Sequence, residues 1–271
     1  MTDEHSATQG QTAGTAIDTT VPHSARIWNY WLGGKDNYEI DRVAGDQFSA
    51  IYPGIVDIAR ADRAFLGRVI RYMTDEAGVR QFLDVGTGLP TAANTHQVAQ
   101  SAAPESRVVY VDNDPLVLAH ARALLTSSPE GSTSYVDADM HDAGTVLREA
   151  AQWLDLSQPV ALTFMGVLGH VVDHEEARSI VAGLLDGLPS GSYLSINDSV
   201  NTSPALEEAL RVYEASGAVP YRTRTPEQFA GYFDGLELIE PGVVNVDDWR
   251  PDPGSPRGPR IPQLGAVGRK P

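Results

Sequence analysis

Short apolar runs alternate with amphipathic segments through the middle of the chain. Each run is nearly continuous, as in strands that are covered on both faces, and the segments between them carry apolar residues at helical spacing. The expected strands are residues 81–85, 107–111, 133–136, 159–165 and 191–196, and the expected helices are residues 91–102, 115–126, 142–154 and 174–187. This alternation predicts a doubly wound α/β fold with a mainly parallel sheet, whose ligands bind beyond the carboxyl ends of the strands.

The region before these strands has a different residue composition. Residues 1–20 are rich in Thr, Ala, Gly and Gln and carry no apolar face, which is typical of a disordered tail. Residues 21–77 contain many aromatic residues, a Gly33-Gly34 turn and then a long helical pattern. We expect them to form an N-terminal helical cap.

The remaining residues, 78–271, are expected to form the α/β domain itself. Helical patterns at 204–215 and 226–233 come before two further strand-like runs, 236–240 and 264–267. These runs predict an antiparallel final hairpin, which brings the sheet to seven strands.

Composition and charge exclude several classes of protein. The 271 residues include 20 Lys and Arg against 36 Asp and Glu, a formal net charge of −16. Because nucleic-acid binding depends on clustered cations, a nucleic-acid partner is not expected. The absence of cysteine excludes disulfides and thiolate metal sites. No secretory signal or membrane-spanning apolar run is visible, so we expect a cytoplasmic protein without a membrane partner. The oligomeric state stays open.

A glycine-rich turn follows the first expected strand, at Gly86-Thr87-Gly88. Such a turn lets a ligand approach the backbone closely, although many parallel sheets use one only for packing. Dinucleotide-binding turns read G-x-G-x-x-G, but Thr91 stands at the third glycine position here. Asp84, just before the turn, would repel a pyrophosphate and suits a cationic ligand such as an amino-acid ammonium group.

Acidic residues also follow the second and third strands. Asp112 is placed to accept hydrogen bonds from a ribose diol. The alternative role, a helix N-cap, falls to Asp114 before Pro115, so both roles can coexist. Asp139 could accept a hydrogen bond from an adenine amino group while Met140 packs on the ring. Acids at three successive strand ends favour an adenosine-containing ligand.

Three segments, residues 24–38, 82–91 and 109–115, carry a family resemblance. The chain resembles class I S-adenosylmethionine (SAM) dependent methyltransferases, and more narrowly a bacterial family of S-adenosyl methyltransferases whose acceptors are mostly unassigned. The resemblance implies SAM as cofactor and methyl transfer to a small-molecule acceptor. It assigns the methionine moiety to Asp84 and the glycine turn, and the adenosine to Asp112, Asn113, Asp139 and Met140.

One departure from the family concerns the end of the fifth strand. The resemblance leads us to expect Ser-His, and this chain has Asn197-Asp198. If the histidine serves relatives as a base, Asp198 must replace it here. Asp198 and His170, which follows the fourth strand, are therefore the candidate catalytic residues. A packing role for His170 remains the alternative.

A metal site is not expected. His170 and His174 are four residues apart, but Asp173 and Glu176 form a capping box pattern that opens a helix at His174. The sequence also lacks a second histidine at the spacing of H-E-x-x-H.

The segment from Arg26 to Tyr38 has a density of polar and aromatic residues that favours a lid over the ligand site. Tyr30, Gly33 and Lys35 in this lid, and Phe164 in the fourth strand, are further candidate cofactor-binding residues. A surface helical hairpin with a glycine C-cap is the alternative.

Two other functions are compatible with this pattern. A SAM- or nucleoside-binding sensor without methyl transfer would show the same donor site. A dinucleotide-dependent oxidoreductase is disfavoured by Asp84 and Thr91.

Overall fold

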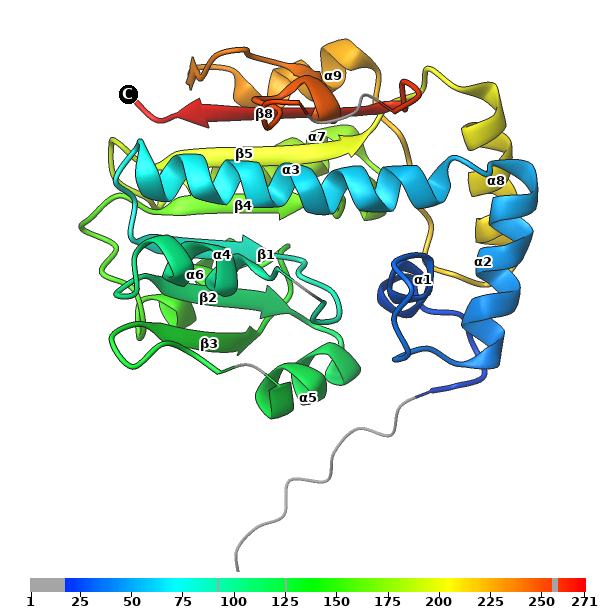
Figure 1. Ribbon diagram of the computed structural model, residues 1–271, viewed down its shortest axis with the longest axis horizontal. Helices are drawn as coiled ribbons and strands as arrows, with labels where there is room; N and C mark the ends of the chain where they lie inside the picture. Colours follow the sequence, from blue (N-terminus) through cyan, green and yellow to red (C-terminus); the bar gives the residue numbers. More distant parts are fainter. Residues whose placement is uncertain (1–17, 92, 125, 255–257) are drawn as a thin grey trace, which may run out of the picture.

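The computed structural model describes residues 18–91, 93–124, 126–254 and 258–271. Most of the expected disordered tail, residues 1–17, lies outside the described residues. Eight strands form one sheet in the order β3-β2-β1-β4-β5-β8-β6, and β7 pairs with β8 (Figure 1). The strands are β1 (Gln81–Val85), β2 (Arg107–Asp112), β3 (Ser132–Asp137), β4 (Ala161–Met165), β5 (Tyr193–Ser199), β6 (Glu237–Leu238), β7 (Val244–Asn245) and β8 (Gln263–Arg269).

Strands β1 to β5 are all parallel, and β8 runs antiparallel to β5 and to β6. The predicted mainly parallel sheet with an antiparallel final hairpin is therefore confirmed. The sequence did not indicate β7, because two paired residues are too few to form an apolar run. In register, Val85 of β1 lies beside Val111 of β2 and Phe164 of β4. The carboxyl ends of these three strands therefore meet at one edge of the sheet.

Helices cover both faces of the sheet. The described helices are α1 (Ser24–Trp31), α2 (Glu39–Ile51), α3 (Ile55–Asp75), α4 (Thr95–Ala102), α5 (Pro115–Leu124), α6 (Ala143–Ala150), α7 (His174–Asp186), α8 (Pro204–Ala215) and α9 (Pro226–Ala230). Successive residues of a strand point to opposite faces, so Phe82 joins the core under α3 and α4, whereas Leu83 joins the core under α6 and α7. None of the helices in the described ranges is both long and apolar enough to cross a membrane.

The predicted N-terminal cap divides into two parts in space. Helices α1 and α2 lie with α8 beyond the carboxyl ends of the strands, whereas α3 runs along the sheet and contacts β4 and β8 (Figure 1). The boundaries predicted for the cap remain a prediction. The structure places α1 and α2 as the elements able to cover a ligand at the strand ends.

A buried ion pair fastens α1 to α2. Nε of Arg26 lies 2.9 Å from Oδ2 of Asp41, and both side chains are almost fully inaccessible to solvent. The Asp41 carboxylate also accepts hydrogen bonds from the backbone N–H groups of His23 (2.9 Å) and Tyr38 (2.8 Å). One carboxylate thus holds the start of α1, the start of α2 and the chain between them.

Candidate functional site

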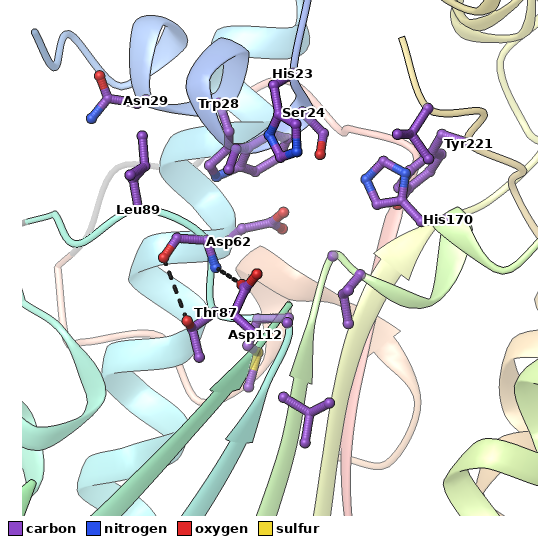
Figure 2. A pocket seen from close by; sticks show the side chains of 18 of the residues that line it. His23, Ser24, Trp28, Asn29, Asp62, Thr87, Leu89, Asp112, His170 and Tyr221 are labelled. Atoms are coloured by element: carbon purple, nitrogen blue, oxygen red, sulfur yellow. Dashed lines mark hydrogen bonds between the residues drawn. The ribbon is translucent and has the colours of Figure 1, made fainter. Parts of the chain in front are cut away.

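A cavity of about 410 Å³ opens where the carboxyl ends of β1, β2, β3 and β4 meet. Its volume is in the range of small-molecule sites. Its lining comes from the loops after these strands and from α1, α2, α3 and α8. Figure 2 shows Thr87 and Asp112 on the side of the strand ends and His170 and Tyr221 on another side, while Trp28 of α1 and His23, just before α1, point into the cavity.

The glycine turn after β1 depends on its glycines. Gly86 has φ +72° and Gly88 has φ +61°, values that L side chains rarely adopt. A Cβ atom added at Gly86 would lie 2.2 Å from Cγ2 of Val167. The loop after β4 therefore packs directly on this turn, and a larger residue at Gly86 would push the two apart.

Asp112, at the end of β2, is oriented by two backbone donors. Its Oδ2 accepts from N–H of Gly88 and its Oδ1 from N–H of Asp114, both at 3.0 Å. Each carboxylate oxygen can accept two hydrogen bonds, so one acceptor position on each oxygen remains after these contacts. Burial raises the pKa of Asp112, while the two backbone hydrogen bonds lower it. The pair of oxygens matches the two hydroxyls of a ribose diol.

Asp84, at the end of β1, is held by two hydroxyl groups. Thr95 donates to its Oδ2 at 2.5 Å, and Thr163 donates to its Oδ1 at 2.9 Å. Burial raises the pKa of Asp84, whereas the two hydroxyls and the nearby Arg63 guanidinium lower it. Asp84 and Arg63 both line the cavity, so an anion and a cation stand side by side next to the glycine turn.

The residues after β3 line the end of the cavity nearest to α5. Ala138, Asp139 and Met140 belong to the lining, together with Asn113 from the loop after β2. Oδ1 of Asp139 accepts from the backbone N–H of His141 at 3.0 Å and lies 2.5 Å from Nδ1 of the same residue. Burial raises the pKa of Asp139, but these His141 contacts outweigh it and bring the pKa below its usual value.

His170 lines the cavity from the short 3-10 turn after β4. Its Nδ1 lies 3.0 Å from the carbonyl oxygen of Pro220 and must donate to it, because a carbonyl only accepts. The lone pair of the neutral ring is then on Nε2. Burial lowers the pKa of His170, although the Pro220 contact raises it. Its ring stands edge-on to Tyr221, with centroids 5.1 Å apart.

Asp198, the other candidate catalytic residue, lies outside the cavity lining. Its side chain is fully buried in β5 and accepts a hydrogen bond from the hydroxyl of Tyr221, which does line the cavity. Burial raises the pKa of Asp198 to about 6, against the lowering effect of the Tyr221 hydrogen bond. Asp198 is therefore connected to the cavity through lining residues, chiefly the Tyr221 hydroxyl.

Four other candidates also lie outside the described lining of the cavity. The Tyr30 hydroxyl donates to Asp46 at 2.8 Å, and Gly33 and Lys35 are exposed in the loop after α1. Phe164 is fully buried in the core under α6 and α7. None of these placements provides a direct contact with a ligand in the cavity.

His174 turns away from the cavity. It begins α7, where the Asp173 side chain accepts from N–H of Glu176 at 2.8 Å. This bond is one half of the predicted capping box, and the described hydrogen bonds of this helix start do not include the reciprocal bond from the Glu176 side chain. Its ring packs against Tyr232, with centroids 5.5 Å apart. Within the described residues, no group of three or more His, Cys, Asp or Glu side chains could hold a metal ion.

Sequence reasoning missed the cavity residues on α2, α3 and α8. Asp62 and Arg63 line the cavity from α3. Asp62 shares one helical face with Ile58 and Phe65, which are buried, and an acid on a buried apolar face is a signal that could have been found. Six mostly apolar lining residues of α1, α2 and α8 form what we call the helical wall: Trp28, Trp31, Phe48, Leu206, Leu210 and Tyr213.

Comparison with known proteins agrees with this geometry. Residues 10–271 match the model of a family described as S-adenosyl methyltransferase. A DUF574 family protein from Streptomyces avermitilis is 47% identical over 94% of this chain and 100% of its own, with a TM-score of 0.91. A protein from Thermobifida fusca is 38% identical over 93% of this chain and 96% of its own, with a TM-score of 0.85.

A more distant structure has the same fold. The SAM-dependent methyltransferase from Anabaena variabilis is 15% identical, covers 75% of this chain and 83% of its own, and has a TM-score of 0.50. A search of curated proteins finds no match.

Proposed function

The chain belongs to the S-adenosyl methyltransferase family. From this premise we propose which part of its cavity binds the methyl donor, the donor half, and which part binds the methyl acceptor, the acceptor half. The protein is a SAM-dependent methyltransferase that acts on a small molecule. Family membership therefore favours methyl transfer over the sensor and the oxidoreductase. The proposal concerns the residues that bind each partner.

The donor half consists of the strand ends of β1, β2 and β3. Two observations support a fit to SAM: Asp112 keeps an acceptor position on each oxygen, and the glycine turn lines the same cavity. Asp112 would bind the ribose hydroxyls, and Asn113 with Met140 would lie at the adenine. Asp84 and Arg63 would bind the ammonium and carboxylate of the methionine moiety.

The acceptor half lies between the helical wall and the loop that carries His170. When bound, SAM supplies a methyl group on a sulfonium, which is already a good leaving group. The protein must therefore orient the acceptor and keep water out, and the mostly apolar helical wall suits both tasks. Nε2 of His170, left unprotonated by the Pro220 contact, would accept a proton from an O–H or N–H acceptor.

The observation that carries this proposal is the single cavity lined by both Asp112 and His170. The test is a His170→Asn variant, measured in two assays. S-adenosylhomocysteine (SAH) should bind to it with wild-type affinity by calorimetry. Transfer of labelled methyl from SAM into the small-molecule fraction of a cell extract should fall by about 100-fold or more. Undiminished transfer in the variant would remove His170 from the mechanism.

Three expectations from the sequence stay predictions. Nucleic acid is disfavoured as an acceptor by the net charge of −16. The cytoplasmic location and the lid role of the segment from Arg26 to Tyr38 await experiments of their own.

A further inference from the structure

One buried acid in the cavity has no role in binding the donor. The described lining contains four acids, Asp62, Asp84, Asp112 and Asp139, and one Lys or Arg side chain, that of Arg63. The last three acids lie at the strand ends, where the donor is proposed to bind. Asp62 comes instead from α3, and it is only 5% exposed.

The hydrogen-bond donors to Asp62 are neutral, and the neighbouring Arg63 guanidinium interacts with Asp62 less than with Asp84. Nε2 of Gln263 donates to both carboxylate oxygens, at 2.9 Å and 3.1 Å, and the Asn197 amide adds a weaker contact. Both donors are neutral. The strongest charges acting on Asp62 come from Asp198 and then Asp247, which are also acidic. A buried carboxylate that accepts its hydrogen bonds from neutral amides is costly, and a cationic ligand would offset this cost.

The carboxylate faces the place where the two halves of the cavity join. A Cβ atom added at Gly166, directly after β4, would lie 3.6 Å from Oδ2 of Asp62. Val167, the next residue, packs on Gly86 of the donor turn. Asp62 therefore lies beside the end of β4, next to the turn proposed to hold the methionine moiety, and within reach of a ligand under the helical wall.

The helical wall is suited to the body of such a ligand. Trp31 packs on Phe48 with centroids 5.1 Å apart, and Phe48 packs edge-on to Tyr213 at 6.1 Å. Trp28 and Tyr221 add two more aromatic rings to the lining. Aromatic faces attract both apolar rings and cations. A net charge of −16 also favours a cationic ligand during its approach.

We propose that Asp62 is the anchor for an ammonium group on the methyl acceptor, so that the substrates are amines with an apolar or aromatic body. This inference rests on the proposed function, because it assigns the acceptor half of the same cavity. It adds a binding contact and no covalent step. The ammonium binds to Asp62 while the helical wall holds the apolar body.

The first test compares amines with neutral molecules of the same shape. Benzylamine, phenethylamine, tyramine and tryptamine are titrated into the wild-type protein saturated with SAH, each beside the alcohol that has OH in place of the ammonium. At least one amine should bind about 10- to 100-fold more tightly than its alcohol, because hydrogen bonds between charged groups are the stronger ones. If no amine is preferred, the proposal is overturned. A neutral, protonated Asp62 that donates to a carbonyl or hydroxyl would give that result.

The second test uses Asp62→Asn, which keeps the shape and removes the charge. Asp57→Asn is the matched control, because Asp57 is an exposed acid on the same helix. The preference for amines should vanish in Asp62→Asn and persist in Asp57→Asn. Thermal unfolding is measured first to show that Asp62→Asn is folded. An unchanged preference for amines in the folded variant would overturn the proposal.

The same variant also tests whether the ammonium that binds to Asp62 belongs to the acceptor or to the donor. SAH carries an amino-acid ammonium, whereas 5′-methylthioadenosine lacks the amino-acid part. Asp62→Asn should bind both with wild-type affinity. Weaker binding of SAH alone would show that Asp62 holds the ammonium of the donor, which would overturn the inference. If the wild-type protein fails to bind SAH, the proposed function fails instead.

Discussion

The buried ion pair between Arg26 and Asp41 leads to a specific prediction about the stability of α1 and α2. Asp41→Asn keeps the size of the side chain but removes its charge and replaces one acceptor oxygen by an NH₂ group. The Asp41 carboxylate now accepts from Arg26 and from the backbone N–H groups of His23 and Tyr38. At least one of these donors would face another donor in the variant, and the Arg26 guanidinium would remain buried without its counter-charge.

The expected cost follows from the burial of this pair. Breaking a buried ion pair by removing one partner costs about 3–5 kcal/mol. The matched control is Glu39→Gln, in the same helix, whose pair with Arg42 is largely exposed, with side-chain exposures of 80% and 40%. An exposed pair of this kind contributes about 0–1 kcal/mol. The two carboxylate-to-amide changes, at residues two positions apart, should therefore differ by several kcal/mol in their cost to the stability of α1 and α2.

Hydrogen exchange followed by mass spectrometry measures this difference. In Asp41→Asn the amides of α1 and α2 should exchange faster by about two to four orders of magnitude, as expected from a loss of about 3–5 kcal/mol. The amides of β1 to β5 should be much less affected, because the cap lies beyond the sheet. SAH should restore part of the protection, because α1 lines the cavity. Equal exchange in Asp41→Asn and Glu39→Gln would refute the reasoning.

Three further predictions concern the site. Asp112→Asn should weaken SAH binding by about 10- to 100-fold in calorimetry, because charge-assisted bonds to the ribose are lost, and wild-type affinity would remove the ribose assignment. Gly86→Ala should lower the free energy of unfolding in urea by about 1–3 kcal/mol more than Gly88→Ala, because its Cβ would meet Val167 at 2.2 Å, whereas that of Gly88 would lie 3.9 Å from its nearest neighbour. Equal losses would contradict the packing argument. The raised pKa of Asp198, about 6 against a usual 3.8, means that the folded state binds this proton more tightly, so stability is lost as pH rises from about 4 to 6. In urea unfolding, Asp198→Asn should therefore gain about 2 kcal/mol relative to wild type between pH 4 and pH 7, and a constant difference would contradict the raised pKa.

The sheet was predictable because its signals are local. Strands β1, β2, β4 and β5 are largely buried, whereas the edge strand β3 is mostly half-buried, and the connecting helices show their own periodicity. Asp84 and Asp112 could be located for the same reason. Both residues end a strand, and the ends of neighbouring parallel strands lie together. Once the strands were recognised, the donor half of the cavity followed from topology.

The acceptor half depends on contacts between distant segments, which local patterns do not reveal. The residues of α1 that line the cavity are Ser24, Ala25, Trp28, Asn29 and Trp31, whereas Tyr30 points to Asp46. The sequence shows that this helix is rich in candidates but does not show which face meets the ligand. The sequence also did not show that Asp198 is buried behind Tyr221, because β5 lies between β4 and β8, and the catalytic role of Asp198 stays a prediction.

The separation of the two halves along the chain has a consequence for enzyme engineering. The strand-end residues proposed to bind the donor lie between residues 84 and 140, whereas the helical wall comes from α1, α2 and α8, all outside that stretch. A combinatorial library at Phe48, Leu206, Leu210 and Tyr213 would therefore reshape the acceptor chamber and leave those residues intact. Laboratory evolution from such a library would start with an intact donor site, so that selection would act on acceptor specificity alone.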